Sequence, residues 1–225
     1  MWNNPDTVMF FCAGKGTRMK ALTQQVPKPM VRVNSVPLVD YALEAMSGVN
    51  RRFANTHYLP DILESHLRAA NVEPIHEPEL LETGGGLKHA LPTISRDVLF
   101  TMNTDAVWKG PKPAELLVKQ WDPTRMDGLM LLIPIDRAIG HKGQGDFLRD
   151  KTGLLHRGAG EVFTGLQIIK SKFVERVAET HFSMNVVWDD LLQRKTLFGA
   201  IYPGTWCDVG YPEAIELAET LLKDD

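Results

Sequence analysis

Short runs of apolar residues alternate along this chain with stretches in which apolar residues recur every three or four positions. A run of four to eight apolar residues is typical of a buried strand, and the wider spacing is typical of one face of a helix. The first helical stripe follows Pro37, a residue suited to the first turn of a helix. The predicted strands cover residues 8–12, 30–33, 52–55, 72–76, 98–102, 129–133, 162–169 and 197–202. The predicted helices begin near Pro37, Pro60 and Pro212, and two more cover residues 173–178 and 186–192.

This alternation of strands and helices predicts the fold class, because parallel strands need long crossover connections that are usually helical. We expect an α/β protein with a Rossmann-like, mixed but mainly parallel sheet flanked by helices. Ligands of such a sheet bind at the carboxyl ends of its strands. Residues 135–160 are irregular and rich in glycine, which predicts a loop-rich excursion with short antiparallel strands that can close over a substrate. No linker divides the chain, so residues 1–225 are predicted to form a single domain.

Composition narrows the class of partner. The chain has 225 residues, of which 44% are hydrophobic and 24% are charged, as is usual for a globular protein. Its net charge of −3 provides no general attraction for nucleic acid, so an anion site must be local. No apolar run approaches the ~20 residues of a membrane span, and no signal-peptide core is visible, so we expect a cytoplasmic protein without a membrane partner. Cys12 and Cys207 fit neither a disulfide framework nor a metal-binding spacing.

A glycine loop follows the first predicted strand and carries the clearest chemistry. Residues 8–12 continue into AGKGTRM, and a PKP motif follows at residues 27–29. Glycines allow backbone amides to turn toward an anion, while Arg18 offers a planar fork and Lys28 a compact charge. Two better-known loops do not fit, since a dinucleotide fingerprint needs a small residue where Met19 stands and a P-loop pattern occurs nowhere. These residues therefore predict a polyphosphate-binding site in preference to an ordinary surface turn.

Two aspartates are candidates for a magnesium site. Asp105 ends the Asn103-Thr104-Asp105 segment that directly follows the predicted strand at residues 98–102, and Asp208 also leaves a strand-like segment. Mg²⁺ is held in proteins by one or two carboxylates together with substrate phosphates. The alternative for each is a solvated aspartate in a turn.

Three consecutive glycines, Gly84 to Gly86, precede a helical segment at residues 87–91. Ordering glycine is entropically unfavourable, and we see no packing purpose for three of them in the sequence. We interpret them as a place where the backbone approaches a flat ligand at a helix N-terminus. The alternative is a flexible loop tip.

Taken in order, these motifs resemble those of the sugar-phosphate nucleotidyltransferases over essentially the whole chain. The motifs that carry the resemblance are GKGTRM, PKPM, LETGGG, NTDAVW, GQGDF, FTGLQI and WCDVGYPE. Among the branches of this family, the chain is most similar to the N-acetylmuramic acid 1-phosphate uridylyltransferases of peptidoglycan recycling, and the compact mannose-1-phosphate guanylyltransferases share much of the pattern. Departures include Cys12 where alanine is usual, Tyr211 where threonine is usual, and the lack of an EKP lysine motif.

The resemblance implies a role for each motif. Catalysis would depend on Arg18, Lys28 and Asp105, and Mg²⁺ would bind Asp105 and Asp208. The nucleotide would contact Ala13, Gly14, Gly16, Thr17, Arg18, Lys28, Glu82, Gly84 and Gly85. The sugar phosphate would contact Asn103, Gly145, Asp146 and Thr164.

The expected activity is nucleotidyl transfer from a nucleoside triphosphate, with UTP the first candidate, to a sugar 1-phosphate, with N-acetylmuramic acid 1-phosphate the first candidate. The products are an NDP-sugar and pyrophosphate. Guanylyl transfer to mannose 1-phosphate stays open, as does a non-catalytic sensor of nucleotide or sugar phosphate. A sensor needs the loop but not two carboxylates. The expected state is a monomer or a small homo-oligomer.

Overall fold

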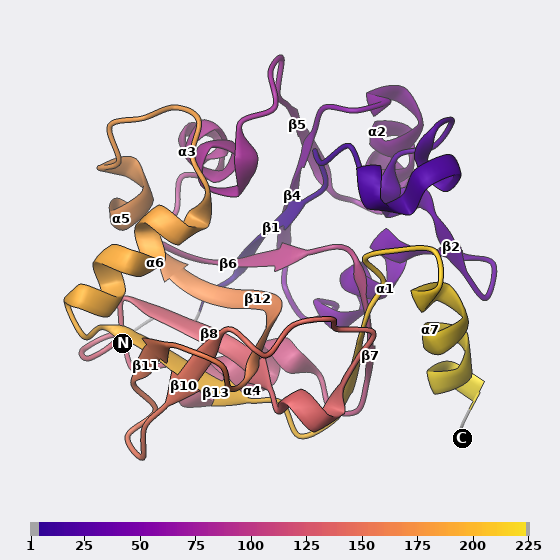
Figure 1. Ribbon diagram of the computed structural model, residues 1–225. Helices are drawn as coiled ribbons and strands as arrows, with labels where there is room; N and C mark the ends of the chain where they lie inside the picture. The colour runs from indigo at the N-terminus through magenta and orange to yellow at the C-terminus, as the bar shows by residue number, and fades with distance from the viewer. Residues whose placement is uncertain (1–4, 224–225) are drawn as a thin grey trace.

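The computed structural model describes residues 5–223 and is built around one twisted sheet (Figure 1). Seven strands follow the order β13-β8-β12-β6-β1-β4-β5. Neighbouring strands are parallel except at β12, which is antiparallel to both β6 and β8. The sheet is therefore mixed and mainly parallel, as the sequence predicts. The bounds are β1 Thr7–Phe11, β4 Arg51–Thr56, β5 Glu73–His76, β6 Val98–Asn103, β8 Gly128–Ile133, β12 Val162–Lys170 and β13 Leu197–Ile201.

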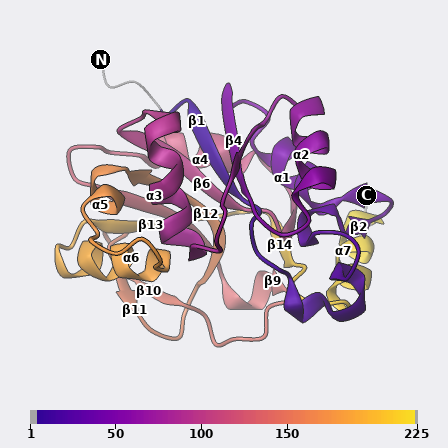
Figure 2. The same cartoon turned by 90° about the horizontal axis from the view of Figure 1, so that it is seen from above.

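Helices cover both faces of this sheet. Apolar residues of α1, α2 and α4 pack into one buried cluster, and those of α3, α5 and α6 pack into another. Residues of β1 alternate between the two, since Val8 and Phe10 belong to the first cluster and Met9 to the second. Figure 2 shows α3, α5 and α6 grouped on one side and α1 and α2 on the other. The helices are α1 Leu38–Ala45, α2 Pro60–Ala69, α3 Glu82–Ile94, α4 Pro113–Gln120, α5 Lys172–Glu175, α6 Met184–Gln193 and α7 Ala214–Lys223.

A smaller sheet of three strands, in the order β7-β14-β9, lies beyond the carboxyl end of β6. Its strands are β7 Ala106–Lys109, β9 Ala138–Ile139 and β14 Thr205–Asp208. Val107 and Cys207 share a buried cluster with apolar residues of α7. Because β14 pairs with β7 in antiparallel register, Asp208 lies opposite Ala106, the residue after Asp105.

The remaining elements are short. An antiparallel hairpin of β10 Phe147–Arg149 and β11 Leu155–Arg157 confirms the short strands predicted for the excursion. A second hairpin joins β2 Arg32–Val33 and β3 Val36–Pro37. Three segments form 3₁₀ helices: Thr17–Thr23, Lys28–Met30 and Ile135–Arg137.

Several elements differ from the prediction. Residues 30–33 contribute only a two-residue strand, because a 3₁₀ turn occupies their first position. The helix expected at residues 173–178 is the short α5, and α3 already begins at Glu82, so it includes the three glycines. The sequence reading missed α4 and β7. Within residues 5–223, no helix combines the length and the apolar character needed to cross a lipid bilayer.

Candidate active site

The glycine loop begins where β1 ends, at the edge of the sheet where β6 also ends. Gly16 has φ +63°, and a Cβ atom there would lie 2.7 Å from the Cβ of Lys28. Glycine is therefore required for the loop to approach the PKP motif this closely. A Cβ atom at Gly14 would meet nothing within 4 Å, so the backbone there is open to a ligand.

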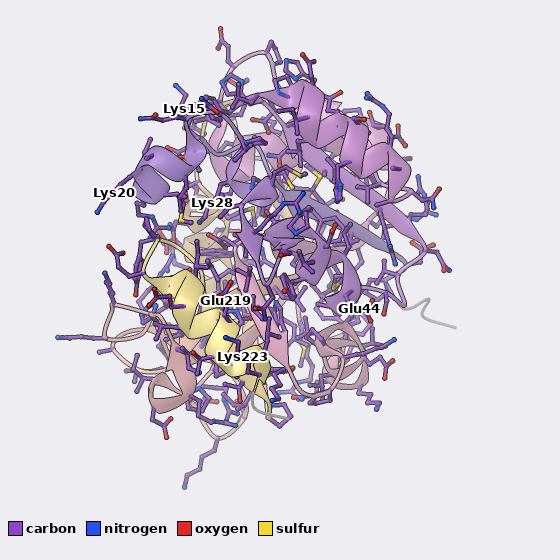
Figure 3. The ribbon with its side chains drawn as sticks, turned by 90° about the vertical axis from the view of Figure 1, so that its right-hand side faces the viewer. Lys15, Lys20, Lys28, Glu44, Glu219 and Lys223 are labelled. Atoms are coloured by element: carbon purple, nitrogen blue, oxygen red, sulfur yellow. The ribbon has the colours of Figure 1, made fainter. Side chains whose placement is uncertain are left out.

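Lys28 meets Asp105 at the edge of this loop. The Nζ of Lys28 lies 2.6 Å from Oδ2 of Asp105, and both side chains are largely shielded from solvent. The hydroxyl of Thr104 donates to the carbonyl oxygen of Phe11 over 3.0 Å, which ties the end of β6 to the end of β1. Figure 3 shows Lys28 on the same side of the molecule as Lys15 and Lys20.

Asp208 lies beside Asp105 because of the strand register, although 103 positions separate them in the sequence. The amide of Val209 donates to the carbonyl oxygen of Asp105 over 2.8 Å. Burial, and then the negative charge of Asp105, raise the pKa of Asp208 from 3.8 to about 6, while Lys28 and Arg18 oppose the shift. Two neighbouring carboxylates are suited to a divalent cation.

Arg18 reaches the same place from the glycine loop. A Cβ atom at Gly210 would lie 3.3 Å from Nη1 of Arg18 and 3.1 Å from Oδ1 of Asp208. The glycine in the CDVG motif therefore leaves room for the guanidinium beside the second carboxylate.

A cavity of about 460 Å³ opens between the glycine loop, the end of β6 and the start of α3. Nine predicted site residues line it: Ala13, Gly14, Gly16, Thr17, Arg18, Lys28, Glu82, Asn103 and Asp105. Asp208 is not part of the lining, but Gly210 is. The sequence reading missed the other lining residues, which are Phe11, Cys12, Pro29, Asn55, Leu80, Thr83, Thr104, Ser183 and Gly210. The sequence could have indicated Asn55 and Thr104, because each is a polar residue at the carboxyl end of a strand in the main sheet.

The donor set fits magnesium better than a metal held wholly by protein. Among residues 5–223, no group of three or more His, Cys, Asp or Glu side chains converges on one point. Asp105 and Asp208 supply two carboxylates, and Mg²⁺ characteristically takes its other ligands from water and substrate phosphates. Burial raises the pKa of the Cys12 thiol to about 12, so this lining residue is not a nucleophile at neutral pH.

The three glycines of LETGGG have a packing role that the sequence did not reveal. They form the first turns of α3 and are buried. A Cβ atom at Gly84 would overlap the ring of Phe182, and one at Gly85 would overlap the carbonyl oxygen of Thr180. The amide of Gly85 donates to the carbonyl oxygen of Phe182 over 2.9 Å. Close packing of α3 therefore requires these glycines. Neither Gly84 nor Gly85 lines the cavity, and their contacts with a nucleotide stay a prediction.

Three residues expected to bind the sugar phosphate also lie outside the cavity lining. Gly145 has φ +92° and packs against the carbonyl oxygen of Gly160. Oδ2 of Asp146 accepts the amide hydrogen of Phe163 over 2.8 Å, and the hydroxyl of Thr164 donates to the carbonyl oxygen of Leu131 over 2.7 Å. These polar groups are satisfied within the protein, and their contacts with a sugar stay a prediction.

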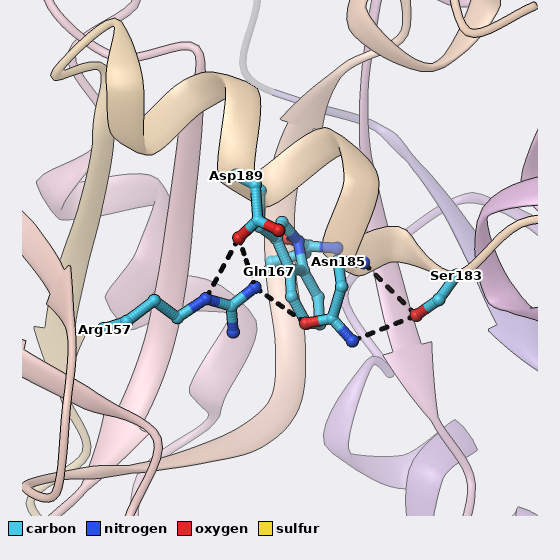
Figure 4. Close-up of polar contacts among 6 residues, drawn as sticks. Arg157, Gln167, Ser183, Asn185 and Asp189 are labelled. Carbon is cyan, nitrogen blue, oxygen red and sulfur yellow. Dashed lines mark hydrogen bonds and ion pairs between the residues drawn. The ribbon is translucent and has the colours of Figure 1, made fainter.

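The excursion is attached to α6 beside the cavity (Figure 4). Arg157, on β11, donates to Asp189 over 2.8 Å and to Asn185 over 2.7 Å. Asn185 in turn donates to the hydroxyl of Ser183, which lines the cavity. The hairpin of β10 and β11 is therefore held next to the site by side-chain contacts.

Comparison with known proteins identifies the family. Residues 8–138 match the model of the MobA-like NTP transferase domain. The chain is 31% identical to the N-acetylmuramate alpha-1-phosphate uridylyltransferase of Caulobacter vibrioides over 98% of each chain. It is 25% identical to the mannose-1-phosphate guanylyltransferase catalytic subunit beta of Xenopus tropicalis, covering 91% of this chain and 61% of that protein.

A solved structure shares the fold. HddC from Yersinia pseudotuberculosis complexed with GMP-PN superposes with a TM-score of 0.76 at 24% identity, over 96% of this chain and 99% of that one. Together with the site geometry, these matches show that the chain is a nucleotidyltransferase that belongs to the family of MobA-like NTP transferase domains.

Proposed function

We propose that this enzyme joins a sugar 1-phosphate to a nucleoside monophosphate unit taken from a nucleoside triphosphate, with N-acetylmuramic acid 1-phosphate and UTP as its substrates. The observation that carries the proposal is the meeting of Lys28, Asp105 and Asp208 beside an open glycine loop. The named activity of the Caulobacter vibrioides relative supports this choice of sugar and base. A reaction that uses a nucleoside triphosphate agrees with the expected cytoplasmic location.

The reaction requires no covalent enzyme intermediate. An oxygen of the sugar 1-phosphate attacks the α-phosphorus, a new P–O bond forms, and the bond from the α-phosphorus to the bridging oxygen breaks as pyrophosphate leaves. Charge moves between phosphate oxygens, so catalysis of this kind depends on positioning and on neutralising charge.

Each residue of the site has a role in this scheme. Amides of the glycine loop and Arg18 bind the departing pyrophosphate, and Lys28 neutralises charge that develops on the α-phosphate. Asp105 holds Lys28 in place at 2.6 Å before substrate arrives. Asp105 and Asp208 would hold Mg²⁺, which supplies Lewis-acid stabilisation of the phosphate oxygens and a template for in-line geometry.

The test is a matrix of purified enzyme with UTP, GTP, dTTP and ATP against the 1-phosphates of N-acetylmuramic acid, N-acetylglucosamine, glucose and mannose. Pyrophosphate release is followed with and without Mg²⁺. We expect the highest kcat/KM for UTP with N-acetylmuramic acid 1-phosphate. A maximum at GTP with mannose 1-phosphate would support the alternative that the Xenopus tropicalis relative suggests. Release from no pair, with intact nucleotide binding, would indicate a sensor.

A further inference from the structure

Glu77 is a buried carboxylate that none of the roles above uses. It follows β5 and has 0% exposed surface. Its Oε1 accepts a hydrogen bond from Nδ2 of Asn55 over 2.6 Å, and its Oε2 accepts one from the amide of Leu81 over 3.2 Å. Burying a carboxylate is unfavourable unless donors surround it, so this position calls for a physical reason.

The first bond leads to the glycine loop. Oδ1 of Asn55 accepts the amide hydrogen of Cys12 over 2.7 Å, and Cys12 is the first residue of the loop after β1. A carboxylate can only accept, so Glu77 orients the amide group of Asn55 with its nitrogen inward and its oxygen toward Cys12. Asn55 and Cys12 both line the cavity.

The second bond leads to the start of α3. Leu81 immediately precedes Glu82, which has φ +60°, an uncommon conformation for a residue other than glycine. Such conformations persist where the surroundings enforce them, and they concentrate at functional sites. Glu82 and Thr83 line the same cavity as the glycine loop.

Gly86 provides the space for this arrangement. A Cβ atom there would overlap Oε1 of Glu77 and would lie 2.7 Å from Nδ2 of Asn55. The third glycine of the LETGGG motif therefore accommodates the Glu77–Asn55 pair.

We propose that Glu77 is a positioning residue that holds the glycine loop and the turn at Glu82 at a fixed separation. One carboxylate reaches the loop through Asn55 and the turn through Leu81. A nucleotide that fills the cavity would contact the glycine loop and the turn together, because residues of both line it. This inference rests on the proposed function only in taking a nucleoside triphosphate as the ligand of this cavity.

The first test is Glu77→Gln, a substitution of nearly equal volume. If the oxygen of the new side-chain amide accepts the hydrogen of the Leu81 amide, its nitrogen faces Asn55. Asn55 must then turn its oxygen toward that nitrogen, which leaves its own NH2 group facing the N–H of Cys12, so that two donors oppose each other. The free-energy cost of leaving such a buried group without a hydrogen-bond partner is equivalent to a change of about tenfold or more in an equilibrium constant. We expect KM for the triphosphate to rise by about that factor while KM for the sugar 1-phosphate changes less than about twofold. Glu79→Gln, the same change at an exposed position two residues away, is the matched control.

The second test is the double variant Asn55→Asp with Glu77→Gln. It moves the carboxylate of the pair from position 77 to position 55 and the amide from position 55 to position 77. Asp at position 55 accepts from Cys12 and from the new Gln side chain, and that Gln accepts from Leu81. We therefore expect the double variant to have a lower triphosphate KM than either single variant.

A folded Glu77→Gln variant with unchanged triphosphate KM would overturn the proposal, as would equal rises for both substrates or a double variant no better than the single ones. If Glu77→Gln does not fold, Gly86→Ala displaces the pair without removing a bonding group and must give the same split in KM. Wild-type enzyme that turns over no substrate would contradict the proposed function instead. Calorimetric titration of the same variants with UTP then decides the positioning role without turnover.

Discussion

Removal of the Lys28 ammonium probes the catalytic site directly. The group lies 2.6 Å from Oδ2 of Asp105 and lines the cavity beside Arg18. A preorganised donor aimed at developing charge is worth about 3–4 kcal/mol in the transition state, so Lys28→Ala should lower kcat by about two to three orders of magnitude. The Lys28–Asp105 pair is largely but not fully shielded from solvent, so its loss should lower stability by more than the ~1 kcal/mol of a surface pair and by less than the ~3–5 kcal/mol of a fully buried one. We therefore expect a large loss of turnover in a protein that still folds.

The assay is steady-state pyrophosphate release at saturating triphosphate, sugar 1-phosphate and Mg²⁺, with Tm measured on the same preparations. Lys223→Ala is the matched control, because Lys223 is an exposed lysine at the end of α7, away from the cavity (Figure 3). The control should retain wild-type turnover. A Lys28→Ala enzyme with kcat within about tenfold of wild type would show that the ammonium does not stabilise the transition state.

Three further perturbations test the same site. Burial and the charge of Asp105 raise the pKa of Asp208 from 3.8 to about 6. Between about pH 4 and pH 6 the folded protein therefore keeps a proton on Asp208 that the unfolded chain releases, and the free energy of unfolding falls as pH rises through this window. In EDTA at pH 7, Asp208→Asn should accordingly be more stable than wild type by up to about 3 kcal/mol, and this difference should disappear near pH 4. Denaturant titrations that show the same difference in stability at both pH values would contradict this prediction. Gly16→Ala places a Cβ atom 2.7 Å from that of Lys28 at φ +63°, and it should raise KM for the triphosphate by about tenfold or more, whereas Gly48→Ala, with open space and outside the cavity lining, should leave it unchanged. Chelation of Mg²⁺ should abolish turnover and added Mg²⁺ should restore it; activity that persists in EDTA would remove the metal from the reaction.

Local patterns were sufficient to predict the main sheet and one half of the site. The apolar run of β1, the glycines after it and Asp105 after β6 are each readable within a few residues, and parallel strands bring their carboxyl ends to one edge. The order of predicted strands and helices therefore placed the glycine loop beside Asp105.

Features that depend on contacts between residues far apart in the sequence were harder to predict. Asp208 reaches Asp105 through the antiparallel register of β14 and β7, and β7 was not recognised as a strand. The packing role of the glycines at the start of α3 was not recognised, because their packing partners Phe182 and Thr180 lie about a hundred positions away in the sequence. Glu77 lies between His76 and Pro78 in a segment of mixed polarity, and nothing local indicates that it is fully buried. In each case the decisive neighbour is close in space and remote along the chain.

The most direct test of the account is an experimental structure with Mg²⁺ and a non-hydrolysable UTP analogue. The account predicts one magnesium ion at about 2.1 Å from carboxylate oxygens of both Asp105 and Asp208, with the α-phosphate as a further ligand and the remaining phosphates on the glycine loop. A metal bound elsewhere, or phosphates that do not contact the loop and Lys28, would contradict it.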